Sequence, residues 1–208
     1  MPILSFPALS APPDQNLLAQ RLQQIFETTG FKEQKLPKVN HHGNWSFYPD
    51  VSSRLTQLEL SFESKVDIIW AARGGYGVSD LLGEIDFNGQ KSTIFIGFSD
   101  FSSLMSARYA KSGGLSWHAS MPGGAFWYDD KNVNAFLKQL ESRSPAGEIS
   151  IQEKTSKKIQ GKLFGGCFSV LTNLIGTPYF PSSLEGHILI LEDIEAVSYT
   201  HLTLPTKA

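Results

Sequence analysis

The sequence is poor in cysteine and in net charge. Cys167 is the only cysteine among 208 residues, so no disulfide can form within the chain, which fits a reducing compartment. The 18 Lys and Arg residues nearly balance the 20 Asp and Glu residues and leave a formal net charge of −2. No basic run or stripe stands out, which argues against nucleic acid as the main partner.

Long apolar runs are also missing. No stretch approaches the roughly 20 apolar residues of a membrane span. The N-terminal segment MPILSFPALSAPPDQ lacks the basic region and the apolar core of a signal peptide. We therefore expect a soluble, cytoplasmic protein with no membrane partner. Hydrophobic residues make up 41% of the chain and charged residues 18%, a balance typical of a globular protein.

Short apolar runs alternate with segments of helical period, as they do in βαβ units. Asp14 and Asp50 are each placed to cap the start of a helix, and Gly30 can end the first of these helices. Val66–Ala72 is almost continuously apolar, as expected for a strand covered on both faces of a parallel sheet. The pattern predicts further strands at Ile3–Phe6, Thr93–Gly97 and Leu115–His118, and further helices at Ser102–Lys111 and Asn132–Leu140.

The pattern changes near residue 148. Alternating segments at Glu148–Glu153 and Gln160–Phe164 indicate a more β-rich unit, with a short helix at Cys167–Leu174 and a strand at His187–Leu191. The predicted fold class is α/β. Residues 1–147 are expected to form a Rossmann-like parallel sheet with helices on both faces, and residues 148–196 the start of a smaller, incomplete β-rich domain.

One tight turn, Gly97-Phe98-Ser99-Asp100, joins a predicted strand to a predicted helix. A serine on such a turn is arranged like the nucleophile of a nucleophile elbow, with the next backbone N–H placed to bind an oxyanion. The match is partial, because Phe101 stands where the second glycine usually lies. Capping is the alternative, since Ser and Asp commonly cap helices and Asp100 can cap the helix that follows. These four residues by themselves favour the cap.

A glycine-rich turn, Arg73-Gly74-Gly75-Tyr76-Gly77, follows another predicted strand. It does not fit a dinucleotide-binding loop, because Asp80 occupies the position of the third glycine and would repel a pyrophosphate. A nucleotide-binding enzyme is therefore disfavoured. The N–H groups of the turn could bind a carboxylate or an oxyanion instead, and a plain turn is the alternative.

The histidines show no metal-ligand spacing. His41 and His42 are adjacent, and the remaining three, His118, His187 and His201, are scattered. None of them pairs with another His or with Cys at the spacing of a ligand set, so no metal site is predicted.

Several stretches together resemble the LD-carboxypeptidase family, which includes the microcin-immunity type peptidases. They occur in the family's order and at about its spacing, from the first residues to about Ala196. The stretches are Ala72–Gly77 followed by Leu81-Leu82, Ile96–Leu104, Gly165–Leu171, Gly176–Tyr179 and Gly186–Ile194.

The resemblance implies a serine hydrolase with a Ser–Glu–His triad. Ser99 falls on the position of the nucleophile, and Glu192 falls on the position of the glutamate that orients the histidine. The backbone N–H groups of Gly75 and Asp100 fall on the oxyanion donors. From the residues alone, Glu192 would be read as a solvent-facing acid at a strand end, and Glu195 is its nearest competitor.

The implied reaction is the removal of a terminal D-amino acid from an L-amino acid in cytoplasmic murein peptides. No metal or organic cofactor is implied, and family members often form homodimers. Arg73, Gly74, Tyr76 and His118 are candidates for lining the substrate pocket. The residues after His118 depart from the family's usual His-Gly-Pro, which weakens the assignment of His118.

The resemblance stops near Ala196, and the family's catalytic histidine lies further on. Residues 197–208 (VSYTHLTLPTKA) resemble nothing in the family and look like a translated sequencing adapter, so we expect a foreign tail. His201 follows Glu192 too closely to be that histidine. The chain is therefore expected to be a truncated, inactive fragment of a murein peptidase. The alternative is a non-catalytic peptide- or carboxylate-binding protein of Rossmann-like fold.

Overall fold

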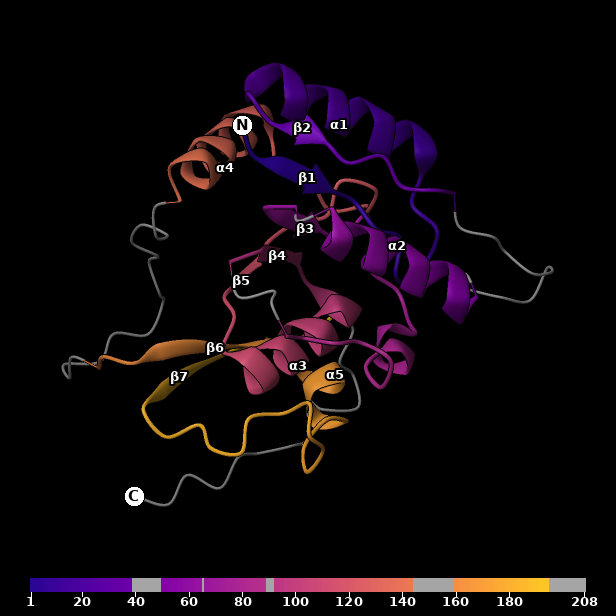
Figure 1. The fold of residues 1–208 in the computed structure, drawn as a ribbon. Coiled ribbons are helices and arrows are strands. Elements are labelled where there is room, and N and C mark those ends of the chain that lie inside the picture. Colours follow the sequence, from indigo (N-terminus) through magenta and orange to yellow (C-terminus); the bar gives the residue numbers. More distant parts are fainter. Residues whose placement is uncertain (39–49, 65, 89–91, 144–158, 195–208) are drawn as a thin grey trace.

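Five parallel strands form the central sheet of the computed structural model, which describes residues 1–38, 50–64, 66–88, 92–143 and 159–194 (Figure 1). The strand order is β2-β1-β3-β4-β5. In register, Ile69 of β3 pairs with Phe95 of β4, and Gly97 of β4 pairs with His118 of β5. The strands are β1 Ile3–Ser5, β2 Lys32–Glu33, β3 Ile68–Trp70, β4 Ile94–Gly97 and β5 Ser116–His118. The expected Rossmann-like parallel sheet is thus confirmed, and the two-residue strand β2 was not predicted.

Helices cover both faces of this sheet, as expected (Figure 1). Alternate residues of β3 point to opposite faces because side chains alternate along a strand. Ile68 packs with α1 and α4, and Ile69 packs with α2 and α3. Each fully buried aliphatic or aromatic side chain stabilises this core by roughly 1.5–3 kcal/mol. The helices are α1 Gln15–Thr28, α2 Val51–Glu63, α3 Ser102–Ser112 and α4 Asp130–Ser142.

The two predicted helix caps are confirmed. Asp14 accepts hydrogen bonds from the N–H groups of Asn16 and Leu17, and Asp50 accepts one from Ser53 at 2.8 Å. Each cap satisfies backbone donors that have no partner within the helix and is worth about 1 kcal/mol. The starts of α1 and α2 are therefore determined by residues close to them in the sequence.

A smaller parallel sheet follows, made of β6 (Lys162–Cys167) and β7 (His187–Glu192), with the short helix α5 (Phe168–Thr172) between them. The strand extends three residues beyond the predicted end at Phe164, and the helix begins at Phe168 instead of Cys167. The cause is close packing, since a Cβ on Gly165 would overlap the carbonyl oxygen of Ile190. Gly165 therefore allows β6 to approach β7 rather than ending the strand, and Gly166, where a Cβ would lie 2.5 Å from Oγ of Ser102, allows it to approach α3.

The small sheet leaves apolar side chains open to solvent. Leu163, Leu189, Ile190 and Leu191 are between 48% and 64% exposed. The predicted strand at 148–153, the tail at 197–208 and three of the histidines (His41, His42 and His201) lie outside the described residues. The domain limits proposed from the sequence stay predictions. Among the helices in the described ranges, none has the length and apolar character needed to cross a membrane.

Candidate active site

The candidate residues gather where strands end. The glycine turn follows β3, Ser99 follows β4, and His118 is the last residue of β5. Because these strands are parallel, their carboxyl ends lie at one edge of the sheet, where ligands bind in open α/β folds. Glu192 is the last residue of β7 in the small sheet. The structure thus brings the nucleophile candidate, the glycine turn and His118 to one edge.

Ser99 has a backbone conformation that serine rarely adopts. Its φ is 58°, in the left-handed region, and it begins the 3₁₀ turn η2 (Ser99–Phe101). A non-glycine residue there costs of order 1–3 kcal/mol and is held in place by its surroundings. A Cβ on Gly97 would lie 2.6 Å from Cδ1 of Phe101, so only glycine permits the chain to turn this sharply. The sharp strand-to-helix turn of a nucleophile elbow is therefore present.

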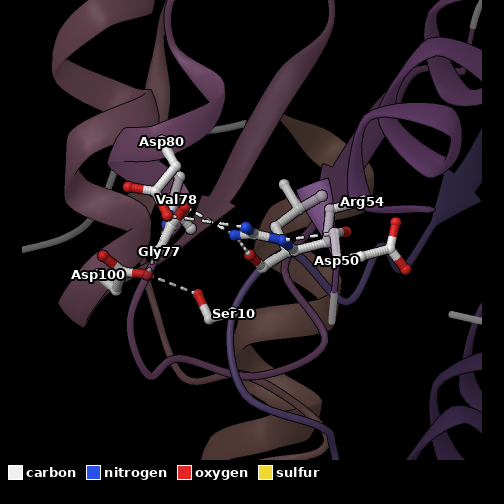
Figure 2. A network of polar contacts seen from close by, with 8 residues as sticks. Ser10, Asp50, Arg54, Gly77, Val78, Asp80 and Asp100 are labelled. Carbon is white, nitrogen blue, oxygen red and sulfur yellow. Dashed lines mark hydrogen bonds and ion pairs between the residues drawn. The ribbon is translucent and has the colours of Figure 1, made fainter. Parts of the chain in front are cut away.

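The capping interpretation of this turn is wrong. Neither η2 nor α3 receives a side-chain cap. The Asp100 carboxylate instead accepts hydrogen bonds from the Ser10 hydroxyl at 2.8 Å and from the Val78 N–H at 3.0 Å (Figure 2). Asp100 thus binds segments that are distant in sequence, a use that its local pattern gave no sign of.

The glycine turn lies directly beside Ser99. A Cβ built on Gly74 would lie 3.3 Å from Oγ of Ser99 and 3.0 Å from the terminal methyl of Met121. Gly75 has a φ of 150°, and a Cβ there would lie 2.7 Å from the backbone nitrogen of Ala11. Within the described residues, the N–H groups of Gly74 and Gly75 donate no hydrogen bond. Donors of this kind can bind an anion without first breaking another interaction.

Burial raises the pKa of the Asp100 carboxyl above its ordinary value. The hydrogen bonds from Val78 and Ser10 and the positive charge of Arg54 oppose this rise, while the negative charge of Asp80 adds to it. Arg54 is fully buried and was not singled out from the sequence. Its position on α2 coincides with the apolar face, and that position was the only available sign that its side chain points inward.

Glu192 has one buried carboxylate oxygen. Within the described part of the chain, its Oε1 is buried and has no hydrogen-bond partner. Loss of solvent lowers the pKa of His118, and the negative charge of Glu192 opposes part of this lowering. The neighbouring Asp193 has a structural role, because it accepts the Ser169 N–H at 3.0 Å at the start of α5. The carboxylate of Glu192 thus has a buried acceptor oxygen and lies close enough to His118 for its charge to influence the pKa of that ring.

The other pocket candidates are less engaged with Ser99. The guanidinium of Arg73 donates to the carbonyl oxygen of Pro12 at 2.8 Å, and the residue is exposed. Tyr76 is 74% exposed. The ring of His118 contacts that of Phe98, with centroids 5.9 Å apart. Met121 and Ser10, which contact the turn and Asp100, were missed because their partners lie far away in sequence. Among the described residues, no group of three His, Cys, Asp or Glu side chains could hold a metal ion.

Two protein-family models match separate parts of the chain. Residues 5–119 match the model of the LD-carboxypeptidase N-terminal domain, and residues 160–204 match that of the LD-carboxypeptidase C-terminal domain. The chain is 32% identical over 203 residues to a Bacillus subtilis protein named "Probable murein peptide carboxypeptidase", covering 92% of this chain and 62% of that protein. It is 25% identical over 170 residues to the microcin C7 self-immunity protein MccF of Escherichia coli, covering 65% of this chain and 49% of that protein.

The fold also has solved counterparts. The crystal structure of muramoyltetrapeptide carboxypeptidase from Oxalobacter formigenes aligns with a TM-score of 0.74 at 26% identity, over 93% of this chain and 66% of that one. The chain therefore spans between about half and two thirds of the length of these relatives. The family models cover more than half of its residues, in the order that the motifs predicted. The chain belongs to the LD-carboxypeptidase family.

Proposed function

We propose that this chain carries the nucleophile part of a serine carboxypeptidase that releases a terminal D-amino acid from an L-amino acid in cytoplasmic murein peptides. The observation that carries the proposal is the position of Ser99, on a strained turn against Gly74, whose N–H donates no hydrogen bond to any residue that the structure describes. The names of the Bacillus and Oxalobacter relatives support the substrate class.

In the proposed reaction, the hydroxyl of Ser99 attacks the carbonyl carbon of the scissile peptide bond. The backbone N–H groups of Gly75 and Asp100 stabilise the negative charge that forms on the carbonyl oxygen. A histidine accepts the serine proton and donates it to the amine that leaves as the C–N bond breaks, and Glu192 orients this histidine. Water then gives a proton to the same histidine, attacks the ester on Ser99 and releases the shortened peptide, and the proton returns to Ser99. The family resemblance assigns that role to a histidine that follows Glu192.

The remaining donors of the glycine turn suit the free carboxylate of the substrate's terminal residue. A terminal D-amino acid carries a free carboxylate, and clustered backbone N–H groups bind carboxylates well. Arg73 adds a positive charge within the same turn. A carboxypeptidase needs such recognition, because it must distinguish the last residue of a peptide from internal ones.

The test uses the product of the complete reading frame that contains this sequence. Wild-type protein should release D-alanine from murein tetrapeptide, and Ser99→Ala should lower kcat by at least ~10³-fold, as loss of a nucleophile does. Ser79→Ala is the matched control, because Ser79 is an exposed serine close to the glycine turn. Undiminished release by Ser99→Ala would show that another residue is the nucleophile.

A non-catalytic carboxylate-binding protein is the second candidate, favoured by the unengaged donors of the glycine turn. Such a protein would bind murein tetrapeptide without releasing D-alanine, and its Ser99→Ala variant would bind the peptide as tightly as the wild type. Release of D-alanine separates the two candidates, because only the enzyme produces it. Calorimetry with the tetrapeptide and with a tetrapeptide amide, which lacks the terminal carboxylate, shows whether the carboxylate is bound.

A further inference from the structure

We propose that Asp100 and Arg54 are positioning residues: they fix the glycine turn against residues 9–11 and thereby set its N–H groups relative to Ser99. The inference rests on the proposed function for its catalytic meaning, because the N–H groups are the proposed oxyanion donors. The fixed geometry itself can be measured without any catalysis.

Asp100 joins three parts of the chain. Its Oδ2 accepts the Ser10 hydroxyl, 90 residues away, and the Val78 N–H, 22 residues away (Figure 2). Asp100 directly follows Ser99, and its side chain is 7% exposed, so its carboxylate moves with the nucleophile turn. The same oxygen therefore connects the nucleophile turn to the N-terminal loop and to the end of the glycine turn.

Arg54 makes a second connection between the same two segments. Its Nη1 donates to the carbonyl oxygen of Leu9 at 3.1 Å and to that of Gly77 at 2.6 Å. Figure 2 shows the guanidinium lying between these segments. Its Nη2 lies 3.8 Å from Oδ2 of Asp80. Arg54 reaches them from α2 and Asp100 from the end of β4, so two separate elements hold one contact.

The residues held in this way are consecutive on both sides. Leu9 bonds to Arg54, Ser10 bonds to Asp100, and the next residue, Ala11, packs against Gly75 without room for a Cβ. Across the contact, Gly77 bonds to Arg54 and the following residue, Val78, to Asp100. Since every partner except the half-buried Gly77 is buried, water cannot easily replace a lost bond. Loss of either side chain should loosen the turn at the residues that face Ser99.

A purely structural role for Asp100 would affect stability as a whole, whereas a positioning role affects the glycine turn specifically. The readout is therefore amide hydrogen exchange, residue by residue, in the 208-residue chain. Asp100→Ala should speed exchange at Val78 by ~10-fold or more, the factor that corresponds to one lost hydrogen bond. Amides of α4, which lies on the opposite face of the sheet, should change only as far as global stability changes.

Asp100→Asn provides the rescue. An asparagine oxygen at the position of Oδ2 can still accept both hydrogen bonds, so exchange at Val78 should stay within ~3-fold of the wild-type rate. In the reading-frame product, Asp100→Ala should lower kcat for D-alanine release by ~10-fold or more, and Asp100→Asn should restore most of it. Equal exchange at Val78 in wild type and Asp100→Ala would overturn the proposal, as would failure of Asp100→Asn to rescue.

If Asp100→Ala does not fold, a matched pair of serine variants tests the positioning role instead. Ser10 and Ser106 are 1% and 2% exposed, and each donates one long-range hydrogen bond, to Asp100 at 2.8 Å and to Tyr179 at 2.9 Å. Ser10→Ala should speed exchange at Val78, and Ser106→Ala should not. The same rate in both variants would overturn the proposal. If these exchange effects appear but wild type releases no D-alanine, the positioning stands and the proposed function fails.

Discussion

Gly74 lies against Ser99, so that a Cβ on Gly74 would come within 3.2 Å of Cβ and 3.3 Å of Oγ of the serine. The turn backbone and the hydroxyl are thus in direct contact, although they lie 25 residues apart in sequence (99 − 74). This contact, more than the composition of either segment, is the basis for treating them as one site.

Gly74→Ala should disturb the site more than the fold. The new methyl needs Ser99 and Met121 to move by only a few tenths of an ångström, because the distances are 3.0 to 3.3 Å. We expect the free energy of unfolding to fall by about 1 kcal/mol, and labelling of Ser99 by a serine-directed phosphonate, in the reading-frame product, to slow by ~10-fold or more. Gly124→Ala, whose nearest contact is 3.4 Å, is the control. Unchanged labelling of Gly74→Ala would contradict the close contact.

Ser99→Gly should stabilise the protein while removing the nucleophile. Glycine adopts a φ of 58° without strain, so urea unfolding should show a gain of about 1 kcal/mol. Arg143→Gly is the control for the backbone effect, because Arg143 has a φ of 49° at the end of α4, away from the site. This substitution also removes the exposed ion pair of Arg143 with Asp67 at 3.1 Å, which offsets part of the gain. Both variants should gain stability, and only Ser99→Gly should lose phosphonate labelling. A loss of stability in Ser99→Gly would mean that the serine side chain contributes more to the fold than its backbone costs.

Glu192→Gln should lower the pKa of His118 further. Loss of solvent lowers the pKa of His118, and the negative charge of Glu192 partly opposes this change. Glutamine removes the charge while keeping the shape of the side chain. An NMR titration of the His118 ring proton measures the change directly. Glu185→Gln, an exposed acid before β7, should leave the titration of His118 as it is. An upward shift in Glu192→Gln would show that Glu192 does not act on His118 through its charge.

Asp100 should make stability fall as the pH rises. Its pKa is raised in the native state, so the folded protein binds this proton more tightly than the unfolded chain, whose aspartates titrate near ~3.9. This contribution is fully present below that value and is lost as the pH rises through the native pKa. The difference in unfolding free energy between Asp100→Asn and wild type should therefore increase from pH 3 to pH 7.

Urea unfolding at each pH measures this difference, and Asp130→Asn reports the effect of removing an exposed carboxylate. A difference for Asp100→Asn that is constant across this range would show that burial of Asp100 does not disfavour its charge. The lowered pKa of His118 makes stability rise with pH. This effect cancels in the comparison, because both proteins contain His118.

Local patterns predicted most of the scaffold. The caps at Asp14 and Asp50 were correct because a cap uses donors two or three residues away. The buried strand around Ile69 was correct because a strand covered on both faces has few polar residues. The limits of β6 were wrong because Gly165 serves a contact with β7 and Gly166 a contact with Ser102, and no local pattern encodes such contacts.

The sequence by itself determined the order of elements, the parallel sheet and the placement of Ser99 at a strand end. It left two interpretations of Ser99 and Asp100 open, because a cap and a nucleophile turn use the same residue types. The tertiary structure decided against the cap through the φ of Ser99 and through the partners of Asp100. Those partners lie 90 and 22 residues away, and only the packed sheet brings them within hydrogen-bond distance.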